Sequence, residues 1–294
     1  MRIGITGASG LLGTALVPAL RGAGHAVVRI GRGADADVRW NPAAGELDAA
    51  DCAGIDAFVH LAGANVGQRW TTAHRRAIRD SRVAGTTLIA RTAAALTPRP
   101  RVLVSASAVG IYGDAGAAVC DESAPAGHDY LAEVCHAWES SADAARAAGI
   151  RTVHLRFGVI LSRRGGALGK LLPVFRLGAG GRVGDGRQWM SWLSLEDTVG
   201  VVRFALETDG LAGAVNATAP QPVTNAEFTA TLARVVHRPA LFPVPAFALN
   251  LMFGEMAQAT LLASQRAVPR QLEAAGYVFR HTTLESALRA AVNE

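Results

Sequence analysis

Lysine is almost absent from this sequence. Lys170 is the only lysine among 29 basic residues, and all the others are arginine. Any chemistry that needs a lysine ammonium at another position is therefore excluded.

Metal-binding patterns are missing as well. Cys52, Cys120 and Cys135 form no CxxC pair, and the eight histidines form no HExxH motif. These spacings do not fit the common zinc sites, so we expect free cysteines and no bound metal.

Long apolar runs are also lacking. The most apolar late stretch, residues 241–263, is interrupted by Pro243, Pro245, Gly254 and Glu255. It is too broken for a membrane span, and we expect two packed pieces, the second a helix. No signal peptide is recognisable, so we expect a cytoplasmic protein without a membrane partner.

The basic residues are scattered along the chain. The formal net charge is +5, but no block of basic residues resembles a nucleic-acid site. Diffuse positive charge favours a small anionic molecule over a polyanion. We therefore expect a small-molecule substrate and no nucleic-acid partner.

The sequence does contain a regular alternation of short β-like runs and longer helical patterns. Half of the 294 residues are hydrophobic, which is enough for a large core. The alternation predicts an α/β fold, a Rossmann-type doubly wound parallel sheet with a smaller, mainly helical C-terminal substrate lobe. We expect a domain over residues 1–240, with lobe segments from about residue 160, and a helical segment over 241–294. Strands are predicted at 2–6, 26–30, 57–61, 101–105 and 151–157, and helices at 11–22, 71–96, 130–148, 166–177 and 196–207.

A glycine-rich turn, TGASGLLG, joins the first predicted strand to the first helix at residues 6–13. Glycines at such a turn tighten the chain, let the backbone approach a pyrophosphate and let the helix pack closely on the sheet. Free amides at the helix N-terminus would then hold the phosphates. The predicted dinucleotide contacts are Gly7, Ser9, Gly10, Leu11, Leu12 and Gly13.

The end of the second strand predicts which dinucleotide binds. An NAD site usually has an acidic residue about 20 residues after the turn, where it bonds the ribose 2′-hydroxyl. Here the strand ends at Arg32 without a carboxylate before Asp35. A guanidinium suits a 2′-phosphate, so we expect NADP(H).

Further motifs lie along the whole chain: HLAGA at 60–64, SASAVGIYG at 105–113, RFGV at 156–159 and GDGRQ at 184–188. With these motifs the sequence resembles an extended short-chain dehydrogenase/reductase (SDR), in the atypical epimerase-like branch that includes nucleoside-diphosphate-sugar epimerase-like proteins. In that family two helices often form a dimer interface. These would be 71–96 and 130–148 here, so a homodimer is one candidate assembly.

The resemblance implies further contacts. It places Leu61, Ala62 and Gly63 on the adenosine and ribose side of the cofactor, Arg82 at the pyrophosphate, and Val159 near the nicotinamide. Ser105 on the central strand is a further cofactor candidate. In the substrate lobe it implies the ligand contacts Lys170, Gln188 and Trp192.

The resemblance fails at the acid/base centre. SDR enzymes use a tyrosine, a lysine four residues later, and a serine on the preceding strand. Ser107 is the best serine candidate, with Ser105 second, and Tyr130 begins the helix where the tyrosine belongs. The residue four positions later is Val134, so no YxxxK motif exists.

Other groups could move the proton instead. Tyr112 is a second tyrosine candidate, and the alternative proton carriers near Tyr130 are His128, Asp129, Cys135 and His136. A tyrosine without a neighbouring ammonium titrates near pH 10. If there is chemistry, Ser107 should therefore contribute more than Tyr130.

Two functions remain open. The first is an NADP-dependent oxidoreductase or epimerase acting on a small polar, nucleotide-sugar-like substrate. The second is a non-catalytic NADP(H)-binding protein that regulates a partner or senses redox state. The predicted ligand contacts in the substrate lobe favour the enzyme, and the missing lysine of the YxxxK motif favours the non-catalytic binding protein.

Overall fold

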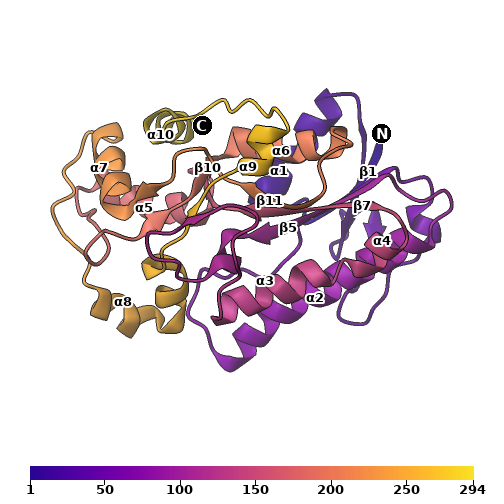
Figure 1. Ribbon diagram of the computed structural model, residues 1–294, viewed down its shortest axis with the longest axis horizontal. Helices are drawn as coiled ribbons and strands as arrows, with labels where there is room; N and C mark the ends of the chain where they lie inside the picture. The colour runs from indigo at the N-terminus through magenta and orange to yellow at the C-terminus, as the bar shows by residue number, and fades with distance from the viewer.

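A computed structural model describes all 294 residues, and its centre is a seven-stranded parallel sheet in the order β11–β7–β5–β4–β1–β2–β3 (Figure 1). The strand order reverses between β1 and β4, and this fold class binds ligands at such a switch point. The predicted fold class is confirmed. The strands are β1 (Arg2–Thr6), β2 (Ala26–Gly31), β3 (Val38–Arg39), β4 (Ala57–His60), β5 (Val102–Ala108), β7 (Arg151–Phe157) and β11 (Gly213–Ala217).

Helices cover both faces of this sheet (Figure 1). On one face lie α1 (Leu11–Gly22) and α6 (Leu195–Glu207), which bury residues such as Leu16 and Val201 in one core cluster. On the other lie α2 (Thr72–Ala95), α3 (Tyr130–Ser140) and α4 (Asp143–Ala147). Dimerisation through α2 and α3 stays a prediction.

The predicted single helix at 130–148 is wrong, because the structure divides it into α3 and α4. The Ser141 hydroxyl donates to the carbonyl of Ala137, and the chain turns at Ser141 and Ala142. A serine hydroxyl that competes for backbone carbonyls weakens a helix interior, which explains the break.

The second half of the chain adds a lobe of short elements beyond β7. Three two-stranded pairings organise it: β8 with β10, β9 with β12, and β6 with β13. Through β13, the C-terminal segment joins the first half of the chain. The remaining elements are β6 (Val119–Cys120), β8 (Val159–Leu161), α5 (Gly166–Arg176), β9 (Trp189–Met190), β10 (Trp192–Ser194), β12 (Val223–Thr224), α7 (Asn225–Val235), α8 (Ala246–Phe253), β13 (Arg266–Ala267), α9 (Arg270–Ala274) and α10 (Leu284–Asn293), with short helices η1 (Ala50–Cys52), η2 (Val109–Tyr112) and η3 (Ala257–Leu262).

The apolar stretch at 241–263 is less packed than its sequence suggests. It forms α8 and the π-helical turn η3, but Leu249 is the only buried residue of α8. Phe247 and Leu251 are 74% and 76% exposed. The prediction of two packed pieces is therefore wrong for the first piece, α8. None of the helices has both the length and the apolar character that a membrane span requires.

Asp197, near the start of α6, fastens the C-terminal tail to the sheet. Its fully buried carboxyl accepts hydrogen bonds from the backbone amides of Arg280 (2.8 Å) and His281 (3.0 Å). It also accepts from the hydroxyl of Ser194 (2.9 Å), the residue that caps α6. The hydroxyl of Tyr277 donates to the same carboxyl at 3.3 Å. One side chain thus satisfies four donors in two segments that lie far apart in the sequence.

We predict that Asp197→Ala lowers the free energy of unfolding by about 3–5 kcal/mol, because it leaves two backbone amides and a hydroxyl buried without an acceptor. Urea unfolding followed by circular dichroism measures the change. Glu196→Ala is the matched control, since the exposed Glu196 only forms a surface pair with Arg280 and should change stability by less than about 1 kcal/mol. Equal losses in the two variants would contradict this role for Asp197.

Candidate functional site

The turn between β1 and α1 can be built only with glycine at two positions. Gly7 has a φ of +71°, and a Cβ there would lie 2.8 Å from the carbonyl carbon of Leu61. A Cβ on Gly13 would lie 2.3 Å from the carbonyl oxygen of Gly7. The first glycine brings β1 against the end of β4, and the third lets α1 start directly on the turn, as predicted.

The first turn of α1 offers unpaired amides. The backbone N–H groups of Leu11, Leu12 and Gly13 donate to no carbonyl, and no acidic side chain lies in this turn. Ser9 and Gly10 are exposed beside them. Free amides and the positive end of the helix dipole together favour an anion at this point.

Thr6 couples this turn to the end of β4. Its hydroxyl lies 2.7 Å from Nδ1 of His60 and accepts from the amides of Leu61 (3.2 Å) and Ala62 (3.3 Å). Burial lowers the pKa of His60 to about 3, so the ring is neutral at pH 7. The segment Leu61–Ala62–Gly63 is thereby held beside the glycine turn.

Arg82 supports the same segment from α2. Its Nη1 donates to the carbonyls of Ala64 (3.0 Å) and Ile78 (3.1 Å), and its guanidinium lies 4.8 Å from the ring centroid of Trp138. A Cβ on Gly63 would lie 3.3 Å from the guanidinium carbon. Arg82 has no carboxylate partner, so its charge is available to an anion, although the contacts in the structure make it a support of the loop after β4.

Two arginines stand together where β2 ends. Arg32 follows β2, and Arg39 ends β3, paired with Gly31. Both are exposed, form no ion pair, and line a pocket of about 300 Å³. The sequence prediction found Arg32 but missed Arg39, because β3 has only two residues and no recognisable pattern.

Ser107, near the end of β5, belongs to a buried ionic cluster. Its hydroxyl donates to Oε1 of Glu139 at 2.7 Å. Arg156 of β7 holds the same carboxylate with two bonds, Nε to Oε1 at 2.8 Å and Nη2 to Oε2 at 2.9 Å. Burial pushes the pKa of Glu139 up, but the bonds from Arg156 and Ser107 outweigh it and hold that pKa below its usual range. Glu139 is ionised at pH 7, and the hydroxyl of Ser107 donates its hydrogen bond to this carboxylate.

Tyr112 extends this cluster toward the C-terminal segment. Its hydroxyl accepts from Nη1 of Arg156 (3.0 Å) and donates to Oδ1 of Asn216 (2.7 Å). The amide of Asn216 then donates to the carbonyls of Cys120 and Val268. Burial raises the pKa of Tyr112 to about 12. The structure therefore places Tyr112 as a buried link between Arg156 and Asn216, and its role as a catalytic acid/base stays a prediction.

Tyr130 does not join this cluster. Its hydroxyl donates to the backbone carbonyl of Arg75, whose guanidinium lies 4.2 Å from the tyrosine ring centroid. Lys170 is not beside it either, because its Nζ donates to the carbonyl of Gly67 at 2.7 Å. No lysine ammonium activates Tyr130, and burial raises its pKa.

The alternative proton carriers occupy other roles. His128 and His136 are exposed, and Asp129 caps α3 by accepting from the amide of Ala132. Cys135 is buried, and burial raises the pKa of its thiol to about 12. Glu139, which was not among the candidates, is the carboxylate that meets Ser107.

Several predicted ligand contacts are core residues. Trp192 is fully buried, and its indole donates to the carbonyl of Gln221. The amide of Gln188 donates to the carbonyls of Val183 and Leu261. Both side chains are buried and donate to backbone carbonyls, so they do not face a ligand, and the substrate contacts predicted for them are wrong. Ser105 is also fully buried, whereas Val159 is half-buried with its amide bonded to the carbonyl of Ser191.

The fold and the glycine turn are those of the SDR class. The chain belongs to the NAD dependent epimerase/dehydratase family, which it matches over residues 3–217. Residues 244–291 match a domain of unknown function, DUF1731.

Relatives match nearly the full length. An epimerase family protein of Mycobacterium bovis is 45% identical over 290 residues, which are 97% of this chain and 96% of the relative. The crystal structure of human epimerase family protein SDR39U1 with NADPH has a TM-score of 0.91 at 32% identity and covers both chains completely. A nucleoside-diphosphate sugar epimerase from Corynebacterium glutamicum has a TM-score of 0.83 at 35% identity, covering 99% of this chain and 58% of that one.

We predict that Glu139→Gln lowers the free energy of unfolding at pH 7 by about 3 kcal/mol or more, because Arg156 stays buried without a counter-charge. The pKa of Glu139 is lower folded than unfolded, so its contribution is present above an unfolded pKa of about 4.3 and is lost as pH falls through the folded value. The difference in free energy of unfolding between wild type and Glu139→Gln should therefore become smaller as the pH falls from about 5 to about 3. Urea unfolding across this range measures it.

Glu133→Gln is the control on the same helix, because Glu133 is exposed and forms no ion pair. It should leave stability nearly unchanged throughout. The ionic cluster would be contradicted as a source of stability if Glu139→Gln were as stable as wild type at pH 7. It would also be contradicted if the loss of unfolding free energy stayed constant down to pH 3.

Proposed function

We propose that this chain is an NADP(H)-binding protein. The observation that carries the proposal is the pair Arg32 and Arg39 at the end of β2: neither forms an ion pair, although Glu46, Asp48 and Asp51 line the same pocket. A 2′-phosphate is a dianion, and guanidinium groups match phosphate oxygens with paired donors. The human relative whose structure was determined with NADPH supports the same choice of cofactor.

The remaining cofactor contacts follow from the geometry of the turn. The amides of Leu11, Leu12 and Gly13 would receive the pyrophosphate, and Gly7 and Gly10 would keep its path clear. Leu61, Ala62 and Gly63 would border the adenosine side, with Arg82 beneath them. Val159 and the end of β5 would face the nicotinamide, which supplies hydride chemistry when bound.

The residues at the end of β5 do not support the acid/base step of an ordinary SDR enzyme. Tyr130 bonds a backbone carbonyl, no lysine is adjacent, and the proton of Ser107 is committed to Glu139. With this proton committed, Ser107 acts toward a ligand as a hydrogen-bond acceptor. A regulatory or redox-sensing binder, which holds the dinucleotide without turning it over, fits these contacts best.

A second function, oxidation of a small polar alcohol in which bound NADP⁺ would accept the hydride, is favoured by the bond between Ser107 and Glu139. A substrate hydroxyl could pass its proton to Oγ of Ser107 while Ser107 passes its own proton to Glu139. The pKa of Glu139 is lowered, so this carboxylate is a weak base and the step would be slow. A sugar-nucleotide substrate belongs to this second proposal.

Arg32→Ala is expected to weaken NADPH binding by about 10- to 100-fold, since one charge-assisted hydrogen bond contributes about 1.5–3 kcal/mol. Arg39→Ala should do the same, because both arginines line the pocket in which we place the 2′-phosphate. Affinity for NADH should barely change in either variant. Titration calorimetry with both dinucleotides measures these affinities.

Arg91→Ala, an exposed arginine of α2 without an ion pair, controls for a general loss of positive charge. Equal losses for NADPH and NADH, or an equal loss in Arg91→Ala, would show that the pair does not recognise the 2′-phosphate.

A further inference from the structure

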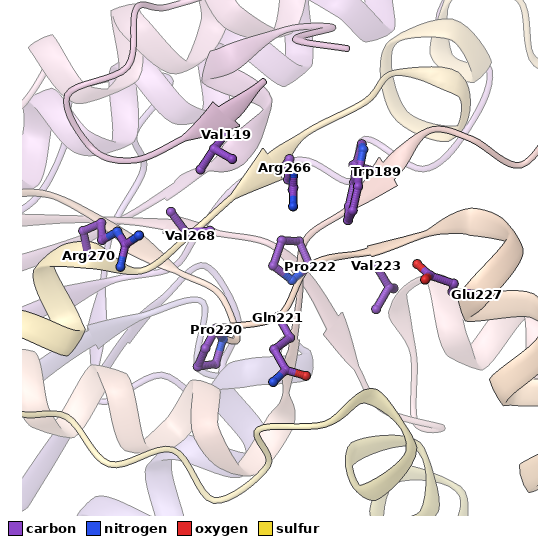
Figure 2. A pocket seen from close by; sticks show the side chains of 10 residues that line it. All are labelled: Val119, Trp189, Pro220, Gln221, Pro222, Val223, Glu227, Arg266, Val268 and Arg270. Atoms are coloured by element: carbon purple, nitrogen blue, oxygen red, sulfur yellow. The ribbon is translucent and has the colours of Figure 1, made fainter. Parts of the chain in front are cut away.

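A second pocket lies beyond the edge of the main sheet, among β6, β9, β12 and β13 (Figure 2). Its volume is about 480 Å³, within the range of small-molecule sites. None of its lining residues belongs to the glycine turn, to the arginine pair at β2 or to the cluster around Ser107. The lining residues are Val119, Trp189, Pro220, Gln221, Pro222, Val223, Glu227, Arg266, Val268 and Arg270.

Arg266 is the distinctive residue of this pocket. Its guanidinium carbon lies 4.1 Å from the ring centroid of Trp189, so the group is stacked on an aromatic face. It is half-buried, donates to no protein acceptor and has no carboxylate within 4 Å. Stacking fixes the plane of the guanidinium while its N–H groups stay free to donate. This arrangement suits an anionic ligand, because a fixed fork of donors binds carboxylate or phosphate oxygens well.

No other charged side chain of the lining forms an ion pair with Arg266. Glu227, the one carboxylate of the lining, accepts from the backbone amide of Thr224 at 2.7 Å and from its hydroxyl at 2.9 Å, as part of the cap of α7. Arg270 adds a second guanidinium, paired 3.2 Å away with Glu273 outside the pocket. An anion that entered would meet one free and one partly neutralised arginine.

The remaining wall is apolar and stiff. Pro220 and Pro222 flank Gln221, and the side chains of Val119 and Val223 lie on opposite sides of the pocket in Figure 2. A ring or hydrocarbon body would be desolvated against these side chains. The pocket is larger than an inorganic anion needs. Its volume and its apolar wall therefore fit a ligand that has an apolar ring or hydrocarbon part as well as a charged group.

We propose that this pocket binds a small organic anion, with its phosphate or carboxylate on Arg266 and its flat apolar body against the proline and valine wall. The site is separate from the dinucleotide site and does not depend on the function proposed above.

Phenyl phosphate is a suitable probe because it combines a flat body with a phosphate. Phenol supplies the body alone, and inorganic phosphate supplies the charge alone. Binding is followed by NMR through the indole N–H signal of Trp189, which Trp189→Phe identifies among the five tryptophans. Phenyl phosphate should shift this signal in a saturable way, with an affinity at least about tenfold higher than phenol or phosphate.

Arg266→Gln should weaken phenyl phosphate binding at least about tenfold and leave NADPH affinity unchanged. Val119→Asp is a second variant that leaves Arg266 in place: Val119 pairs with Arg266 across β6 and β13 and is 52% exposed, so a carboxylate fits there, opposes the charge of Arg266 and should repel the anion. Arg91→Gln, outside the pocket, should have no effect.

The proposal is overturned if phenyl phosphate causes no saturable shift up to about 10 mM, or if phosphate alone binds as well. It is also overturned if Arg266→Gln and Arg91→Gln reduce binding equally. If Arg266→Gln does not fold, Val119→Asp replaces it, and undiminished phenyl phosphate binding in Val119→Asp overturns the proposal.

Discussion

The buried ion pair between Arg156 and Glu139 joins the parts of this molecule that carry the candidate site. Arg156 extends from β7, Glu139 from α3, and their two parallel hydrogen bonds fix both side chains. Ser107 of β5 bonds to the carboxylate, and Tyr112 bonds to the guanidinium. Through Tyr112 and Asn216 the same network reaches the backbone of Val268, so one pair of charges is linked both to Ser107 and to the C-terminal segment.

This pair also determines what the end of β5 can do. In SDR enzymes a lysine lowers the pKa of a tyrosine beside the strand serine. Here an arginine lowers the pKa of a carboxylate beside it, and the serine becomes the donor to that carboxylate. The glycine turn keeps its geometry, because it rests on separate constraints: the close contacts of Gly7 and Gly13 and the bonds of Thr6 to the end of β4. The proposed cofactor site and the ionic cluster at the end of β5 are thus held by different residues.

Features that depend on residues close together in the sequence could be predicted, whereas features that depend on contacts between distant segments could not. The glycine turn was predictable because its requirements lie within eight residues, and Arg32 because it directly follows a recognisable strand. Arg39 and Glu139 were missed because each acquires its neighbours only through folding: Arg39 by pairing of a two-residue strand with β2, and Glu139 by the meeting of α3, β5 and β7. Trp192 and Gln188 show the opposite error. Their motifs are recognisable, but a motif does not say whether its side chains face a ligand or the core, and here both face the core.

The central claim is that the glycine turn and the arginine pair bind NADP(H) in a defined orientation. A crystal structure of this chain with NADPH tests it most directly. The account predicts the 2′-phosphate within hydrogen-bond distance of Arg32 and Arg39, and the pyrophosphate on the amides of Leu11 and Leu12. A dinucleotide whose 2′-phosphate contacts neither arginine, or whose pyrophosphate lies away from the start of α1, would contradict it.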